Sequence, residues 1–282
     1  MRPCPICESD RPRALPAPLA TALVLCRRCG FVYRPDRPTM AALAAAHRAA
    51  GGPHYTEVLT LERSSGTMKT RAHGFAVWTR GVLPPRPALL EIASIDTSIL
   101  APLRLLLPEA RLRAVELADF AGAGGDAPAH EHDGRAWRAA PVAAHAHDAV
   151  VLPYSLQRLP DFAAALAMAR AALAPGGVLY LEVANLLEPH PDKRLRAWMS
   201  SQHFGLFTAD KLEALLAATG FTVVRLQADT SLRVLARQAP VRAPRIASEM
   251  LRVVRALLWH EARYWPPYVV KRVRQLARAR AG

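Results

Sequence analysis

The chain has 282 residues, 51% of them hydrophobic, which suffices for one α/β core with smaller additions at its ends. Its first residues lack the apolar stretch of a secretion signal, and no run approaches the roughly 18 apolar residues that span a bilayer, so a cytoplasmic protein is expected. The net charge of +14 is compatible with nucleic acid or an anionic surface as partner, although a genome rich in arginine codons also produces such a bias.

All four cysteines lie near the N-terminus, as Cys4-x2-Cys7 and Cys26-x2-Cys29. This spacing is typical of zinc ribbons, in which each pair forms a tight knuckle whose two thiolates point the same way. Four thiolates complete a tetrahedron and leave no position for water, so the expected Zn²⁺ is structural. Free or redox-active thiols are the alternative, because a reducing compartment disfavours disulfides.

Helices are expected first after the cysteines, over residues 39–50 with Thr39 as the cap and over residues 66–79. From Ala88 short apolar runs alternate with helices, which indicates a parallel sheet covered on both faces. The expected strands are 89–92, 112–117, 149–152, 178–183, 222–226 and 232–235, and the expected helices are 98–107, 162–173 and 209–219. Residues 121–126 and the His-rich stretch after them are predicted to be loop.

Several motifs resemble those of class I S-adenosylmethionine-dependent methyltransferases that carry a zinc-binding leader. Leu89-Leu-Glu-Ile92 resembles their first strand, and Leu173-Ala-Pro-Gly-Gly177 resembles a turn that they share. The segments Glu91-Ile-Ala-Ser-Ile-Asp96 and Ser231-Leu-Arg-Val234 look closest to the sugar C-methyltransferases of deoxysugar pathways. The resemblance implies an α/β fold: a Rossmann-like methyltransferase sheet with helices on both faces, a small N-terminal zinc ribbon and a C-terminal helical extension.

Four regions follow from this reading. They are a zinc-binding module over 1–38, a helical linker region over 39–84, a methyltransferase-like domain over 85–238 and a basic helical tail over 239–282. The tail contains ten Arg or Lys residues between Arg242 and Arg280, against only Glu249 and Glu261. Its apolar stripe and aromatic residues predict a helix that lies on an anionic membrane surface, or alternatively packs on its own domain or on a second subunit.

The resemblance implies S-adenosylmethionine as methyl donor, held by residues after the first two strands of the sheet. The cofactor residues expected are Glu91, Ala93, Ser94, Asp96 and Glu116. Glu116 ends the second strand and is placed to accept hydrogen bonds from the ribose hydroxyls, with a solvated carboxylate as the alternative. The loop lacks the glycines that let the backbone approach the donor in the family, so this site is expected to be partly retained and partly degraded.

His203 matches a histidine of the sugar C-methyltransferases and is the expected catalytic base, with a helix-capping histidine as the alternative. Gln157 stands near where those relatives carry another histidine. Tyr154, Glu182 and Asn185 follow or end strands on the ligand-binding edge of such sheets and are expected to contact the substrate, although a packing role fits Tyr154 equally.

The predicted function is S-adenosylmethionine-dependent methyl transfer to a sugar, a glycan precursor or another small metabolite, by a cytoplasmic protein that is peripheral to the membrane through its tail. One alternative is an inactive methyltransferase-like scaffold or partner protein, which the glycine-free loop favours. A second is a nucleic-acid-binding or modifying protein, which the charge favours. The residues between the cysteine pairs lack the interleaved basic and aromatic pattern that stacks on bases.

Overall fold

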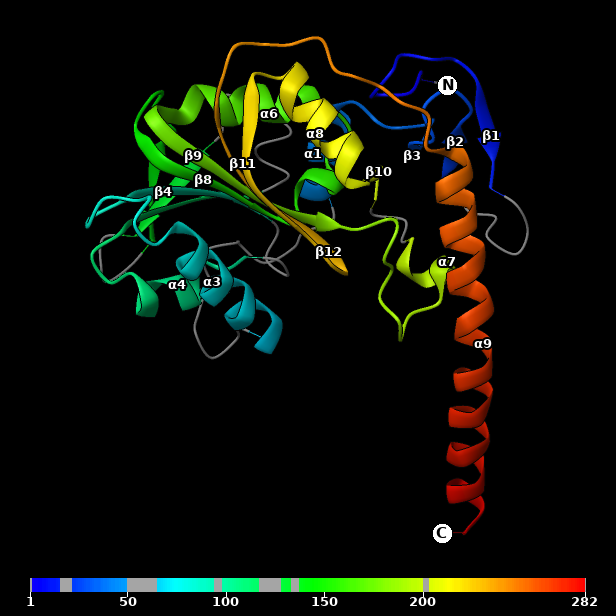
Figure 1. Cartoon of the computed structure of the whole chain (residues 1–282). Helices are drawn as coiled ribbons and strands as arrows, with labels where there is room; N and C mark the ends of the chain where they lie inside the picture. The colour runs from blue at the N-terminus through cyan, green and yellow to red at the C-terminus, as the bar shows by residue number, and fades with distance from the viewer. Residues whose placement is uncertain are drawn as a thin grey trace.

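The computed structural model describes residues 2–15, 22–49, 65–93, 98–116, 128–132, 137–199 and 203–281. Its centre is an eight-stranded sheet with the order β11-β12-β9-β8-β4-β5-β6-β7 (Figure 1). Its strands are β4 (Ala88–Ala93), β5 (Arg111–Glu116), β6 (Pro128–His132), β7 (Trp137–Pro141), β8 (His147–Pro153), β9 (Leu173–Ala184), β11 (Phe221–Ala228) and β12 (Ser231–Gln238). Strands β5, β4, β8 and β9 are parallel, whereas β12 is antiparallel to both of its neighbours, β9 and β11.

Helices cover both faces of this sheet, as the sequence predicted. In Figure 1, α3 (Gly66–Thr79) and α4 (Leu100–Leu106) lie below it, and α6 (Phe162–Ala172) and α8 (Ala209–Ala218) lie above it. Alternation along β9 divides the core: Tyr180 packs edge-on against Phe75 of α3, with ring centroids 5.0 Å apart, while Leu179 and Leu181 join the cluster on the α6 side. The predicted Rossmann-like α/β fold is therefore confirmed.

Short polar side chains begin the predicted helices. The Ser65 hydroxyl accepts the Met68 amide at 3.2 Å at the start of α3, and the Asp161 carboxylate accepts the Ala164 amide at 3.0 Å at the start of α6. Thr39 caps α1 (Met40–Ala49), as expected. Each cap satisfies an amide that has no partner within its helix, so these boundaries are encoded locally.

The prediction of loop for the His-rich stretch after residue 126 is wrong, because β6 and β7 form an antiparallel hairpin on the edge of the sheet. Apart from Trp137, these two strands contain only Pro, Ala, His, Glu and Arg, none of which is enriched in strands, so the local pattern favours a loop. Backbone pairing of β6 with the free edge of β5 overrides that preference. Residues 121–126 lie outside the described residues.

The cysteine-containing segment forms a second, four-stranded sheet that recruits a late part of the chain. Its order is β1 (Pro12–Ala14), β2 (Val24–Cys26), β3 (Val32–Tyr33) and β10 (Gly205–Leu206). Gly205 lies between two aromatic rings, since a Cβ there would approach Cζ of Phe31 and of Phe162 to 2.7 Å. The N-terminal sheet therefore packs directly against the main core, so the predicted boundary at residue 38 does not separate two cores. The four region boundaries stay predictions.

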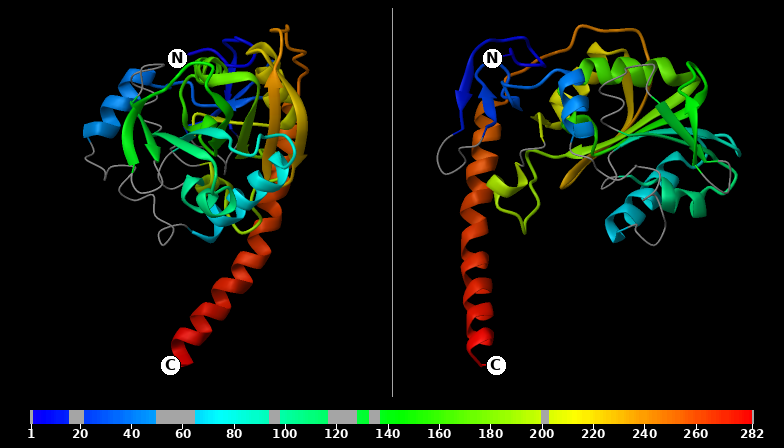
Figure 2. Two further views of the ribbon diagram at one scale, coloured as in Figure 1. Left: turned by 90° about the vertical axis from the view of Figure 1, so that its left-hand side faces the viewer. Right: turned by 180° about the vertical axis from the view of Figure 1, so that it is seen from behind.

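The basic tail is an extended strap followed by one long helix, α9 (Met250–Ala281). The first turns of α9 bury Val253 and Leu257 beside the N-terminal sheet and the short helix α7 (Leu195–Trp198). Beyond this contact the helix projects away from the body of the protein (Figures 1 and 2). None of the described helices is long and apolar enough to cross a bilayer.

Candidate functional site

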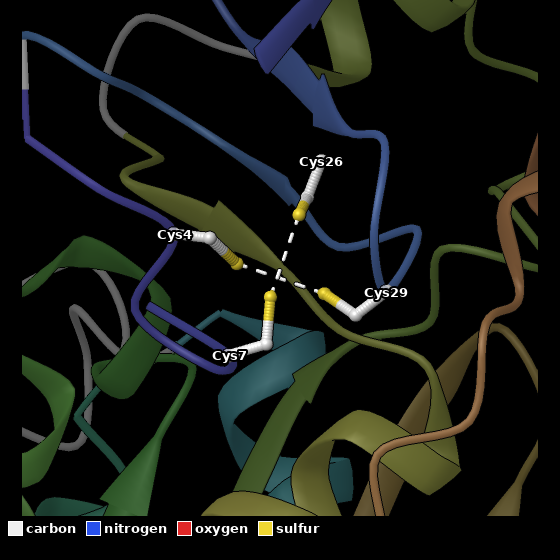
Figure 3. A group of neighbouring side chains, drawn as sticks. All are labelled: Cys4, Cys7, Cys26 and Cys29. Carbon is white, nitrogen blue, oxygen red and sulfur yellow. Dashed lines mark hydrogen bonds between the residues drawn. The ribbon is translucent and has the colours of Figure 1, made fainter. Parts of the chain in front are cut away.

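The four cysteine side chains converge from two turns of the N-terminal sheet (Figure 3). All four are buried and none forms a disulfide, and their sulfur atoms all lie within 4.8 Å of one another. The Sγ atoms of Cys4 and Cys29 are 3.6 Å apart, and those of Cys7 and Cys26 are 3.5 Å apart. Sulfurs around a tetrahedral zinc, with bonds of about 2.3 Å, lie about 3.8 Å apart, so this donor set fits a closed structural Zn²⁺ site.

The two knuckles have the same local geometry. The amide of Glu8 donates to the Cys4 carbonyl at 2.9 Å, and that of Gly30 donates to the Cys26 carbonyl at 2.9 Å. Both Glu8 and Gly30 have positive φ, at 57° and 81°, which turns the chain sharply after each pair. A Cβ on Gly30 would lie 2.6 Å from the Met250 amide, so this glycine also lets the start of α9 dock on the second knuckle.

The parallel strands present their carboxyl ends at one edge of the main sheet, the edge at which α/β sheets bind ligands. The order of the strands changes direction at β4: the next strand in the chain, β5, lies on one side of β4, and the later strand β8 lies on its other side. In the register of β4 with β5, Ala93 is the partner of Glu116, so both predicted cofactor residues end their strands side by side. The structure describes only the backbone of these two residues, and Ser94 and Asp96 lie outside the described part of the chain.

Glu91 braces the loop in which the cofactor residues lie. Its carboxylate is fully buried and accepts hydrogen bonds from the Ser98 hydroxyl and, at 2.7 Å, from the Ile99 amide. Oε2 of Glu91 binds the Ser98 hydroxyl and Oε1 binds the Ile99 amide, both at the start of α4. The contacts support a role in holding the far end of the loop, whereas direct contact of Glu91 with the cofactor stays a prediction.

A buried ionic cluster surrounds Glu182, near the carboxyl end of β9. One carboxylate oxygen accepts the Tyr180 hydroxyl and Arg233 Nε, each at 2.8 Å, and the other lies 3.4 Å from Arg71 Nε. Burial opposes the charge on Arg233, but its hydrogen bond to Glu182 and the nearby negative charges outweigh burial and raise its pKa. The guanidinium groups of Arg71 and Arg233 thus share the carboxylate of Glu182, which is 1% exposed.

Tyr154 stands beside this cluster in a strained conformation. Its φ is 56°, in the left-handed region that bulky residues rarely adopt, and its amide donates to the Glu182 carbonyl at 2.8 Å. The Arg71 guanidinium carbon lies 3.9 Å from the centre of its ring, and burial raises the pKa of its hydroxyl. Tyr154 also packs against a buried apolar cluster that includes Leu186, so its contact with substrate stays a prediction beside the packing role.

His203 contacts Gln157 of the short 3₁₀ helix η2 (Leu156–Arg158), with His203 Nε2 and Gln157 Nε2 3.1 Å apart. Burial, followed by the charges of Arg158, Arg34 and Lys193, lowers the pKa of His203 to about 4. A group with this pKa is a weak proton acceptor at neutral pH. The role of His203 as general base stays a prediction.

The side-chain amide of Asn185 forms hydrogen bonds with the backbone of Asp229 and Leu187. Its amide nitrogen donates to the Asp229 carbonyl at 2.7 Å, and its oxygen accepts the Leu187 amide at 3.1 Å. These bonds tie the end of β9 to the turn between β11 and β12 and leave the residue 3% exposed. Contact of Asn185 with substrate stays a prediction.

The sequence did not single out Arg71, Arg233 or Gln157 as site residues. A signal existed for Arg233, which lies inside the segment Ser231-Leu-Arg-Val234 that resembles the sugar C-methyltransferases. Gln157 stands where those relatives carry a histidine. Arg71 lies in α3, at a distance in sequence that no local pattern relates to Glu182.

A separate groove of about 720 Å³ lies between α8, the start of β11 and the strap over residues 239–247. It is lined by acidic and basic side chains, including Glu213 and Arg242. Because it lies at the amino end of β11, which is parallel to β9, it is at the edge opposite the candidate site.

Comparison with protein families matches residues 72–226 to a family described as a methyltransferase domain, over more than half of the chain. The chain belongs to this methyltransferase family. The matched residues begin within α3 and end within β11, so they contain the whole parallel part of the sheet. The predicted class I S-adenosylmethionine-dependent methyltransferase fold is thereby confirmed.

Solved methyltransferase structures are also similar to this methyltransferase. The 1,6-didemethyltoxoflavin-N1-methyltransferase of Burkholderia thailandensis, solved with 1,6-didemethyltoxoflavin and S-adenosylhomocysteine, is 20% identical, with a TM-score of 0.46 over 82% of this chain and 100% of that one. A mitomycin 7-O-methyltransferase is 14% identical, with a TM-score of 0.48 over 73% of this chain and 62% of that one. A search of curated proteins found no match.

The cysteine cluster predicts one zinc ion per chain in the purified methyltransferase. Replacing Cys26→Ser removes one of the four soft ligands, so bound zinc should fall to near zero and the first 35 residues should become sensitive to protease. Elemental analysis by plasma mass spectrometry measures the metal. Ser9→Ala, beside the first knuckle but without a ligand atom, should keep the full zinc content, and a wild-type protein without zinc would contradict the site.

The ionic cluster predicts that neutralising Glu182 lowers the free energy of unfolding much more than neutralising an exposed carboxylate does. Glu182→Gln leaves two partly buried guanidinium groups without their anion and should cost about 3 kcal/mol of unfolding free energy in urea titrations. Glu109→Gln, which breaks the exposed pair with Arg86, should cost less than about 1 kcal/mol. Equal losses in the two variants would show that the cluster is not a stabilising centre.

Proposed function

We propose that this methyltransferase transfers the methyl group of S-adenosylmethionine to a small-molecule acceptor, which is a sugar, a glycan precursor or another small metabolite, at the carboxyl edge of its sheet. The observation that carries the proposal is the reversal of chain order beside β4, with Ala93 and Glu116 ending adjacent strands there. Ligands of α/β sheets bind at such a reversal. The cofactor would supply an electrophilic methyl group on a sulfonium centre.

The cofactor end of the proposed site lies after β4 and β5. Glu116 would accept hydrogen bonds from the ribose hydroxyls, and Ala93, Ser94 and Asp96 would line the methionine end. Glu91 would keep this loop in place through its bonds to the start of α4. The loop over residues 93–98 has no glycine, so its backbone has less freedom to approach the donor than in the family.

The acceptor end of the proposed site lies after β8 and β9. Tyr154, held by Arg71 and Glu182, would form one wall, and His203 with Gln157 would form the other. Displacement at a sulfonium methyl group is fastest when the attacking atom is held in line, so the main task of these residues is to position the acceptor. A rigid, strained Tyr154 suits that task.

Calorimetric titration with S-adenosylmethionine and S-adenosylhomocysteine tests the cofactor end. Binding of both ligands is expected, and Glu116→Ala should weaken each about tenfold or more, because a charged hydrogen-bond acceptor is lost. Glu109→Ala, an exposed carboxylate on the loop before β5, should leave the affinity unchanged. Binding of neither ligand at millimolar concentration would overturn the enzyme proposal in favour of the inactive scaffold.

A second proposal concerns α9, which we infer to rest on an anionic membrane surface. Both acidic residues of the tail are turned inward: Glu249 bonds Lys211 at 3.0 Å and Thr208 at 2.6 Å, and Glu261 lies 4.0 Å from Arg194. Leu251 is 73% exposed and Trp259 65% exposed on the same helix. Cations with exposed aromatic and aliphatic side chains suit the headgroup region of a bilayer better than nucleic acid.

Co-sedimentation with vesicles of phosphatidylglycerol and phosphatidylcholine tests the proposed surface. Binding is expected at low salt, should decrease at 0.5 M salt, and should be lost on pure phosphatidylcholine. Trp259→Ala should weaken it several-fold, whereas Val77→Ala, exposed on α3, should not. Salt-dependent RNA binding without vesicle binding would instead support the nucleic-acid hypothesis.

A further inference from the structure

The side-chain amide of Gln157 has a fixed orientation. Its Oε1 lies 2.7 Å from the backbone nitrogen of Ala184, the last residue of β9. A backbone N–H only donates, so the atom that faces it has to be the amide oxygen. The amide nitrogen of Gln157 therefore faces His203, 3.1 Å from its Nε2.

This orientation decides where the proton of His203 lies. An amide nitrogen only donates, so His203 Nε2 has to accept, and it can do so only without a proton of its own. A neutral imidazole then carries its proton on Nδ1. Among the described residues Nδ1 has no hydrogen-bond partner, although it is closed off from water, so a donor is left open there.

The charges around His203 favour the same neutral form. Arg34 follows β3, Arg158 belongs to η2, and Lys193 precedes α7, and all three oppose a positive imidazole. Burial adds to their effect.

We propose that Gln157 is a positioning residue that holds His203 in its neutral form, with Nε2 accepting from the Gln157 amide and the proton on Nδ1, so that His203 is a fixed, neutral part of the acceptor end and not the general base. The part of this inference that concerns the reaction rests on the proposed methyl transfer.

Nitrogen NMR of the whole protein, labelled with ¹⁵N-histidine, tests the proton position without any activity measurement. The His203 signals are assigned by their loss in His203→Gln. At pH 7 the wild-type protein should show a neutral ring with the proton on Nδ1. A proton on Nε2, or a doubly protonated ring at pH 7, would overturn the inference.

Gln157→Glu tests the positioning role directly. The carboxylate still accepts the Ala184 amide, but it presents an acceptor to His203 in place of a donor. The His203 ring should therefore gain a proton on Nε2, and its pKa should rise by about 1–3 pH units. Gln227→Glu adds the same charge at an exposed position of β11, beside Asp229, and should leave the His203 signals unchanged.

The same samples separate this inference from the proposed function. Calorimetric binding of S-adenosylhomocysteine should be the same within twofold in Gln157→Glu and Gln227→Glu. Normal cofactor binding with the proton on Nε2 in the wild-type protein would overturn only the inference about Gln157. A proton on Nδ1 without cofactor binding would overturn only the proposed function.

Discussion

The convergence of four buried cysteines is the constraint on which the N-terminal sheet and the start of α9 depend. The segment before residue 38 has only short strands, and its buried apolar side chains, such as Phe31 and Leu25, belong to clusters that it shares with the rest of the chain. Four thiols brought within 4.8 Å replace a separate core, and they fix the two turns that end at Glu8 and Gly30. Those turns present Phe31 to the main core and a docking place for α9.

The buried carboxylate of Glu182 plays the corresponding part at the other side of the site. It joins α3, β9 and β12 through Arg71, Tyr180 and Arg233, at the edge where strands of the main sheet end. A buried ion pair contributes little net stability against an apolar replacement, but it is costly to break and therefore favours one arrangement of its partners. Tyr154 lies against Arg71 of this cluster, and its amide donates to the Glu182 carbonyl.

The two walls of the proposed acceptor site differ in chemistry. The Tyr154 wall is aromatic and its charges are largely compensated by Glu182. The His203 wall combines a neutral imidazole with surrounding Arg and Lys side chains, so it offers donors and positive potential. A polar acceptor bound between them would be oriented by stacking on one side and by hydrogen bonds on the other.

The sequence by itself determined six of the eight strands of the main sheet and the helices that cover them, because caps such as Ser65 and the apolar periodicities are local signals. The sequence also predicted the cysteine cluster, because the spacing of Cys4, Cys7, Cys26 and Cys29 can be read directly from it. Only the tertiary structure decided that β6 and β7 extend the sheet and that β10 joins the N-terminal strands, because both depend on backbone pairing with distant edges. The protonation of His203 was likewise beyond the sequence: a histidine's chemistry is set by its partners, and Gln157 reaches it only after folding.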